Sequence, residues 1–234
     1  MNAEPHDAYA PPEIAHRVEH LGVAKARAEA STLLVLAVLA GAFISLGALL
    51  FTVVVTGSTL GVGVTRLLGG LSFCLGMILI VVGGGELFTG NNLIAMAWAS
   101  GLIGTGQLVR NWLLVYAGNV AGSLGTVVLT VWSDVASLGG GAVGETAVAI
   151  ARTKTGLSFG DAFARGILCN ALVCLAVWMV MSGRSTTDKI LATLFPITAF
   201  VTIGLEHSIA NWFFLPYGLA LDRQGAIPLG GSAR

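Results

Sequence analysis

The sequence predicts an all-α membrane protein in which two of the membrane-spanning helices are interrupted inside the bilayer. Hydrophobic residues make up 55% of the chain and charged residues only 10%, whereas soluble domains carry about 25% charged residues. The mean hydropathy is +0.85. Long uncharged runs follow one another along the chain, and the first exceeds the ~20 residues that a helix needs to cross a bilayer. Two of the runs contain a glutamate, and each glutamate marks a predicted interruption.

The first interruption is predicted at residues 83–90, which read Gly-Gly-Gly-Glu-Leu-Phe-Thr-Gly. Glu86 is the only charged residue between Arg66 and Arg110. An ionised carboxylate at the centre of a membrane helix costs roughly 2.5–3.5 kcal/mol, so it is rare without a function. Glycines also weaken a continuous helix. We therefore expect the helix to break here, and its freed backbone groups to line a cavity or to find partners within the protein.

The same arrangement recurs at residues 204–208. Glu206 and Asn211 lie five residues apart, as do Glu86 and Asn91, and an apolar run again precedes the glutamate. Interrupted hydrophobic segments at corresponding positions of two halves indicate a transporter or channel site. We expect these four residues to be structural, with each glutamate accepting hydrogen bonds from N–H groups exposed at its break. Proton transfer by the glutamates is the alternative.

The other elements follow from the uncharged runs and from the turns between them. Residues 1–31 are predicted to form a cytosolic or interfacial segment, because Ile14, Val18 and Leu21 share one helical face. A helix lying on the membrane surface and a cytosolic cap on the bundle both fit this pattern. No basic region precedes an apolar core here, so a signal peptide is not predicted. The transmembrane domain is predicted at 32–220 and a C-terminal tail at 221–234.

Five transmembrane segments are predicted within residues 32–220. The first covers about 32–56, and the second starts near 67 and ends with a half-helix at 91–99. The third covers about 112–132, and a long connection at 133–162 leads to the fourth at about 165–182. The fifth covers about 190–218 and contains the second break. If the two halves are repeats of three helices, one helix is missing from the second repeat.

Composition also argues against several classes of function. The formal net charge is zero, which does not favour a nucleic-acid partner. The four histidines and three cysteines show no metal-ligand spacing, so we expect no metal, no other cofactor and no catalytic residues. Cys74, Cys169 and Cys174 lie in apolar segments and are expected to pack as small hydrophobic side chains, rather than to form disulfides.

Five short motifs between Pro12 and Gly218 occur together, in order, in one known family. They are Gly41-Ala42-Phe43-Ile44, Gly69-Gly70-Leu71-Ser72-Phe73, residues 85–91, Gly166-Ile167-Leu168-Cys169-Asn170 and residues 200–211. On these motifs the chain resembles the formate/nitrite transporters. The resemblance implies an aquaporin-like helical bundle with an inverted repeat, and a homopentamer in the cell membrane with one pore in each protomer. The family's sixth helix has no counterpart after Ala220, so the second repeat is expected to be incomplete.

The resemblance implies roles for apolar residues of the pore. Leu87 and Phe88, followed by a threonine, match the loop that narrows the pore in this family. Phe73 and Phe200, with Met77 nearby, match its apolar constrictions. Without the resemblance, the two phenylalanines are more simply interpreted as core residues.

The resemblance also implies a polar centre of the pore. His207 matches a central histidine, Thr89 and Asn170 match its polar neighbours, and Lys154 matches a lysine at the outer mouth. A histidine titrates near physiological pH, so His207 can lend a permeating anion either a hydrogen bond or a proton. A lysine at an entrance concentrates anions. The simpler alternatives are that His207 is a core histidine and that Thr89 caps a helix. Likewise, Asn170 would make an interhelical hydrogen bond and Lys154 would be a solvated loop charge.

Three classes of function remain in competition. The first is a channel for formate or another small monovalent anion, such as nitrite or hydrosulfide. The second is an aquaporin-type pore for neutral solutes, although Asn91-Asn92-Leu93 and Asn211-Trp212-Phe213 stand where Asn-Pro-Ala would be expected. The third is a membrane enzyme or a metal site built on Glu86, Glu206 and His207. The distribution of basic residues does not decide the orientation in the membrane.

Overall fold

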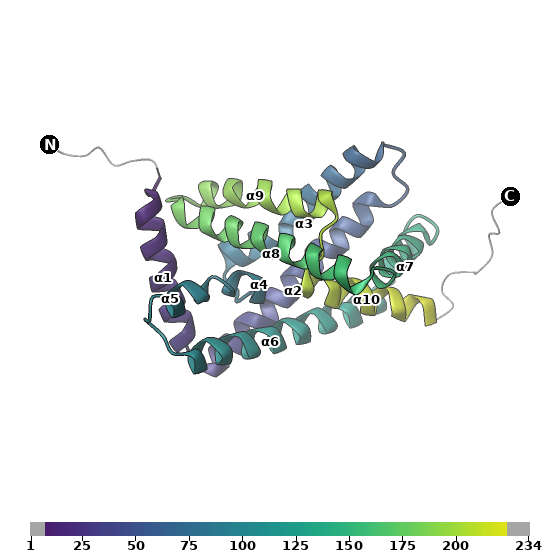
Figure 1. The fold of residues 1–234 in the computed structure, drawn as a ribbon. Helices are drawn as coiled ribbons and strands as arrows, with labels where there is room; N and C mark the ends of the chain where they lie inside the picture. Colours follow the sequence, from purple (N-terminus) through teal and green to yellow (C-terminus); the bar gives the residue numbers. More distant parts are fainter. Residues whose placement is uncertain (1–7, 224–234) are drawn as a thin grey trace.

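The computed structural model describes residues 8–223, which are helical almost throughout (Figure 1). The elements in chain order are α1 (Pro11–Arg27), α2 (Ala30–Val55), α3 (Val62–Gly83), α4 (Phe88–Asn91), α5 (Ile94–Ala99), α6 (Thr105–Trp132), the 3-10 helix η1 (Val135–Ser137), α7 (Ala142–Thr155), α8 (Phe159–Ser182), α9 (Thr186–Ile203) and α10 (Ser208–Arg223). Five of them, α2, α3, α6, α8 and α9, are long and apolar enough to cross a membrane. The chain is therefore a multi-pass membrane protein, as its composition predicted.

Both predicted helix breaks are confirmed. α3 ends at Gly83 and α4 begins at Phe88, while α9 ends at Ile203 and α10 begins at Ser208. Gly84 and Gly204 have φ angles of 89° and 85°, a region that residues with a Cβ rarely adopt. Each of these glycines therefore ends its helix, and the glutamate of each pair lies in the gap that follows.

The bundle is organised around α2. This helix packs against α3 and α6, and α9 in turn packs against α3 and α8. The contact between α2 and α6 is very close, since a Cβ on Gly122 would lie 1.9 Å from the carbonyl oxygen of Val38. Gly118 and Gly122 are therefore the small residues that let α6 approach α2 so closely.

Four predicted helix starts differ from the structure because charged residues were excluded from the helices, and one of them is that of α9, which begins at Thr186 rather than near 190. α3 begins at Val62 and so contains Arg66, and α6 begins at Thr105, ahead of Arg110. α8 begins at Phe159, where the Ser158 hydroxyl accepts a hydrogen bond from the Asp161 N–H at 3.2 Å. Such an N-cap is a local signal for a helix start, and it extends the helix beyond its apolar run.

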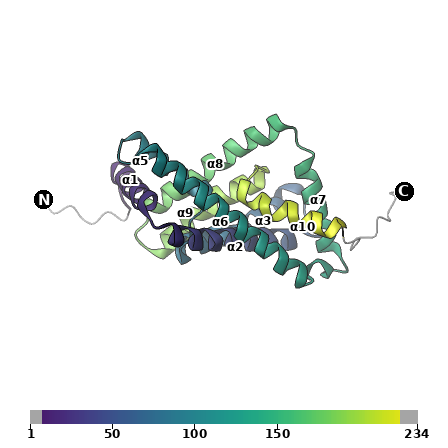
Figure 2. The same ribbon diagram turned by 90° about the horizontal axis from the view of Figure 1, so that it is seen from below.

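The connection predicted at 133–162 contains a helix that the sequence analysis missed. α7 is too short to span a bilayer, and it buries Val143, Ala147, Val148 and Ala151. These residues lie three to four apart, so they form one helical face, and α7 packs against α10. Figures 1 and 2 both place α7 at one end of the bundle and α1 with α5 at the opposite end.

Of the two interpretations of the N-terminal segment, the packing favours a cap on the bundle. α1 buries Ile14, Val18 and Ala26 and contacts α5, α6 and α8. The half-helix predicted at 91–99 is divided into α4 and α5 by a turn at Asn92 and Leu93. Most of the tail predicted at 221–234 lies outside the described residues, which end at Arg223.

Candidate functional site

The two helix breaks meet at one hydrogen bond. Thr89 lies in the first turn of α4 and His207 immediately precedes α10, and the Thr89 Oγ1 and His207 Nε2 atoms are 3.1 Å apart. Both side chains are buried. Residues separated by half of the chain are thus joined at the centre of the bundle, as the family resemblance implied for this pair.

The second ring nitrogen of His207 caps α10. The backbone N–H of Ala210 donates a hydrogen bond to Nδ1 at 3.1 Å, which is the geometry of an N-cap side chain. Since a backbone N–H can only donate, Nδ1 must carry its lone pair toward Ala210. In the neutral ring the proton is therefore on Nε2, which donates to Thr89 Oγ1. The hydroxyl proton of Thr89 is then free to be donated to a further acceptor.

Two phenylalanines cover the imidazole. Phe73 of α3 and Phe200 of α9 form an edge-to-face pair with ring centroids 5.6 Å apart. Phe200 also stacks on His207, with centroids 5.6 Å apart and an interplanar angle of 22°. The two phenylalanines thus lie directly beside His207, and their role as a constriction stays a prediction.

The other predicted apolar residues lie in or beside the core. Met77 and Leu87 are buried in the same cluster as Phe73 and Phe200. Phe88 is half-buried and packs edge-to-face against Tyr116 of α6, with centroids 5.1 Å apart. Their role in narrowing a pore stays a prediction.

The structure corrects the hydrogen bonds predicted for Glu86. Its carboxylate accepts from Lys25 Nζ at 3.0 Å and from Asn91 Nδ2 at 2.7 Å, not from backbone N–H groups. Asn119 of α6 satisfies the backbone at this break instead. It accepts from the Phe88 N–H at 2.9 Å and donates to the Glu86 carbonyl at 2.8 Å. The sequence analysis did not identify Asn119 as a functional or structural residue of the break.

The second break repeats this arrangement. The Glu206 carboxylate accepts from Lys154 Nζ at 2.8 Å and from Asn211 Nδ2 at 2.9 Å. The side chains of Lys154 and Glu206 are only 15% and 11% exposed. The predicted mouth lysine is therefore an ion-paired residue at the break. Each break has one lysine, one glutamate and one asparagine, and the lysines come from α1 and α7, far away in sequence.

Among the described residues, no hydrogen bond joins Asn170 to His207. The Asn170 amide donates to Cys174 Sγ at 3.7 Å, and its buried Oδ1 has no partner among residues 8–223. Cys174, one turn further along α8, donates in turn to the Thr89 carbonyl at 3.6 Å. α8 therefore reaches the first break through this thiol, while Asn170 remains one turn away.

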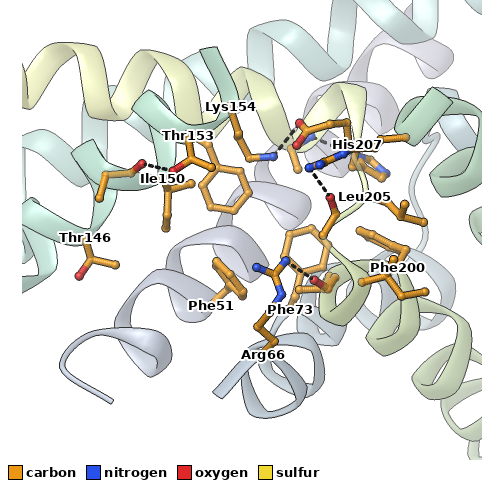
Figure 3. Close-up of a pocket in the computed structure, with 18 residues that line it drawn as sticks. Phe51, Arg66, Phe73, Thr146, Ile150, Thr153, Lys154, Phe200, Leu205 and His207 are labelled. Atoms are coloured by element: carbon orange, nitrogen blue, oxygen red, sulfur yellow. Dashed lines mark hydrogen bonds and ion pairs between the residues drawn. The ribbon is translucent and has the colours of Figure 1, made fainter. Parts of the chain in front are cut away.

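A cavity of about 550 Å³ opens at the α7 end of the bundle and reaches inward to His207 (Figure 3). We call it the vestibule. It is lined by Phe51, Arg66, Phe73, Thr146, residues 149–150, residues 153–154, Arg165, Phe200, Val201, residues 203–207, Ala210 and Phe214. Four of these residues are charged, three positively and one negatively. Two of the cations, Arg66 and Arg165, were not predicted as site residues, because the sequence analysis used them only to weigh the membrane orientation.

No group of three His, Cys, Asp or Glu side chains within residues 8–223 is placed to hold a metal ion. Glu86 and Glu206 each have a lysine partner, and His207 uses one nitrogen as a helix cap. The chemistry that the described site can offer is therefore hydrogen bonding and positive charge, provided at the inner end and along the wall of the vestibule.

Comparison with known proteins gives consistent matches. The model of the formate/nitrite transporter family matches residues 12–232. The formate channel FocA of Escherichia coli strain K12 is 42% identical over 218 residues, which cover 93% of this chain and 76% of FocA. The formate channel FocB of the same strain is 39% identical over 197 residues, or 84% of this chain and 69% of FocB.

Solved structures show the same fold. A pentameric formate channel with formate bound has a TM-score of 0.79 and 46% sequence identity, with 83% of this chain and 76% of that chain covered. An ion channel of the FNT family also has a TM-score of 0.79, at 28% identity, with 88% and 82% covered.

Proposed function

Because this chain belongs to the formate/nitrite transporter family, we propose that it is a membrane channel for small monovalent anions, with formate as its main substrate. The similar formate channels support formate, and so does the similar pentamer with formate bound. The observation that carries the proposal is the Thr89–His207 hydrogen bond at the inner end of the vestibule. In the proposed function, this pair provides a polar contact for the anion where both interrupted helices meet.

The proposed path runs from the vestibule past His207 and Thr89 toward the α1 end of the bundle. A bare anion is poorly solvated beside the rings of Phe73 and Phe200, since an unpaired charge is costly in apolar surroundings. The free hydroxyl proton of Thr89 offers a hydrogen bond at this point. α10 adds its partial positive charge, because its N-terminus begins beside His207.

The hydrogen bonds of His207 support donation of a hydrogen bond rather than of a proton. An imidazolium carries a proton on both nitrogens, and a proton on Nδ1 would face the N–H of Ala210. The ring can hold a second proton only after it leaves the cap of α10. In the proposed mechanism His207 therefore stays neutral and orients Thr89, which contacts the anion directly.

We place the protein in the cell membrane as a homopentamer with one pore in each protomer. The similar pentameric structure supports this assembly. Long apolar side chains of α8 are exposed on the protomer, including Phe159, Phe163 and Ile167. A soluble protein rarely exposes so much apolar surface, so lipid or a neighbouring protomer is expected to cover this face.

A flux assay in liposomes separates the proposed function from its alternatives. Vesicles with and without the protein are tested for uptake of formate, nitrite and glycerol, and for water permeability. We expect protein-dependent formate uptake and no increase in glycerol or water flux. Glycerol or water flux without formate flux would identify a neutral-solute pore and contradict the proposal.

A further inference from the structure

The net positive charge of the vestibule is carried by Arg66 and Arg165 rather than by Lys154. Lys154 and Glu206 are opposite charges separated by 2.8 Å, so their fields largely cancel for an ion that is still entering. At the same end of the bundle, Arg152 is paired with Asp222 at 2.9 Å. Among the described residues that line the vestibule, the two arginines have no acidic partner. They are therefore the groups that an incoming anion meets as positive charge.

Arg66 is fixed in place by the end of α9. Its Nε donates to the Thr202 carbonyl at 2.7 Å and its Nη2 donates to the Val201 carbonyl at 3.1 Å. These are carbonyls of the last turn of α9; the Val201 carbonyl also accepts from the Gly204 N–H at 3.1 Å. A guanidinium carries five N–H donors, and among the described residues Nη1 has no acceptor. Arg66 is thus both a helix cap and a donor that faces the vestibule (Figure 3).

Arg165 approaches the same turn from α8. Its Nη1 donates weakly to the Gly204 carbonyl at 3.4 Å, and the side chain is exposed. The guanidinium of Arg66 lies against the same glycine, since a Cβ on Gly204 would be 2.6 Å from Arg66 Nη2. The absent side chain of Gly204 therefore makes room for Arg66 beside Arg165, on the wall of the vestibule that leads to His207.

We propose that Arg66 and Arg165 form a recruiting subsite for planar anions that present two oxygens, namely carboxylates and nitrite. A guanidinium presents pairs of parallel N–H groups that match two oxygens of one anion, whereas an ammonium acts as a point charge. Hydrosulfide has a single acceptor atom and gains only from the charge. This inference rests on the proposed function and narrows its substrate class, because it separates formate and nitrite from hydrosulfide.

The test uses Arg165, because replacing Arg66 would also expose the end of α9. Initial uptake by liposomes is measured over a range of formate, nitrite and hydrosulfide concentrations, at an alkaline pH where hydrosulfide is the main sulfide species. The proteins are wild type, Arg165→Gln, Arg165→Lys and Arg152→Gln. The last variant removes the same charge from the same end of the bundle, but from outside the vestibule.

We expect Arg165→Gln to raise the half-saturating concentration of all three anions by roughly threefold, the scale of one exposed charge contact, and to leave the maximal rate unchanged. Arg165→Lys should restore hydrosulfide uptake but only part of the affinity for formate and nitrite. Arg152→Gln should resemble wild type.

Two results would overturn the inference while wild type still carries formate. If Arg165→Gln behaves like Arg152→Gln, Arg165 does not recruit anions. If Arg165→Lys restores formate affinity completely, charge alone matters and the two-oxygen class is wrong. A wild-type protein that carries none of the three anions would instead contradict the proposed function, and this inference with it.

Discussion

At the scale of single residues, the sequence located His207 and Thr89 but not the way in which His207 is held. The motif match placed both residues near the pore centre, and they are hydrogen-bonded at 3.1 Å. The cap of Nδ1 on Ala210 could not be predicted with certainty, because it depends on where α10 begins. Asn170 was expected to be a polar neighbour of His207, but it is hydrogen-bonded to Cys174, and it is Cys174, one turn further along α8, that donates to the Thr89 carbonyl.

Replacement of Thr89 tests whether its hydroxyl contacts the anion. Thr89→Val keeps the shape of the side chain but leaves the His207 Nε2–H without its acceptor, which costs about 1–3 kcal/mol for a buried group. We expect formate flux in liposomes to fall at least about tenfold, the equivalent of 1.4 kcal/mol. Thr89→Ser keeps the hydroxyl and is the matched control, with flux near that of wild type. Equal flux in the Val and Ser variants would show that the hydroxyl is not used.

At the scale of secondary-structure elements, the two breaks were predictable but their partners were not. Glu86 and Glu206 inside apolar runs, with their neighbouring glycines, indicated the breaks from local sequence alone. The lysine partners lie on α1 and α7. α1 was one of two open interpretations and α7 was missed, so no local pattern could assign Lys25 or Lys154 to these carboxylates. Asn119 was missed for the same reason, because its backbone partners come from other elements.

The Lys154–Glu206 pair is expected to stabilise the second break. Removing one member of a buried ion pair typically costs about 3–5 kcal/mol, because the other charge is left unpaired, whereas removing both costs less. Lys154→Met should therefore lower the midpoint of thermal unfolding in detergent more than the double variant Lys154→Met with Glu206→Gln. The double variant keeps an amide at position 206 that can still bond to Asn211.

Arg152→Gln is the control for this comparison. Arg152 and its partner Asp222 form an exposed ion pair, in which the Asp222 side chain is 47% exposed. Exposed ion pairs contribute little to stability. Its unfolding midpoint should stay close to that of wild type. A double variant that is less stable than Lys154→Met alone would contradict the assigned role of the pair.

At the scale of the whole molecule, composition was sufficient to predict the class of protein, and the series of motifs was sufficient to predict the family. A 10% share of charged residues is too small for a soluble surface, and five helices long enough to span a membrane follow from the uncharged runs. The vestibule was not predictable in this way. It is formed where residues of α3, α7, α8 and the second break meet, and these residues are far apart in the sequence.

The proposed homopentamer predicts the mass of the particle in mild detergent. Native mass spectrometry should give five times the protomer mass of 24.0 kDa. Crosslinking should give a series of crosslinked oligomers that ends at the pentamer. If a neighbouring protomer covers the apolar face of α8 in the proposed homopentamer, Phe163→Glu should shift the population toward smaller particles, because an unpaired charge is costly in an apolar interface. The exposed residue Thr153, on α7, offers the control Thr153→Glu. A wild-type monomer that still carries formate would contradict the assembly.

The most direct test of the account is formate flux through His207 variants. Liposomes that contain wild type, His207→Asn or His207→Phe are compared for formate uptake between about pH 5 and pH 8, the range in which an ordinary histidine titrates. The Asn side chain offers an oxygen to cap α10 and an N–H to donate to Thr89, so flux should stay within about threefold of wild type. Because His207 stays neutral in the proposed mechanism, the pH profile of this variant should match that of wild type. His207→Phe provides neither group, and its flux should fall at least about tenfold. If His207→Phe carries formate at the wild-type rate throughout this pH range, then His207 only packs the core and the proposed mechanism is wrong.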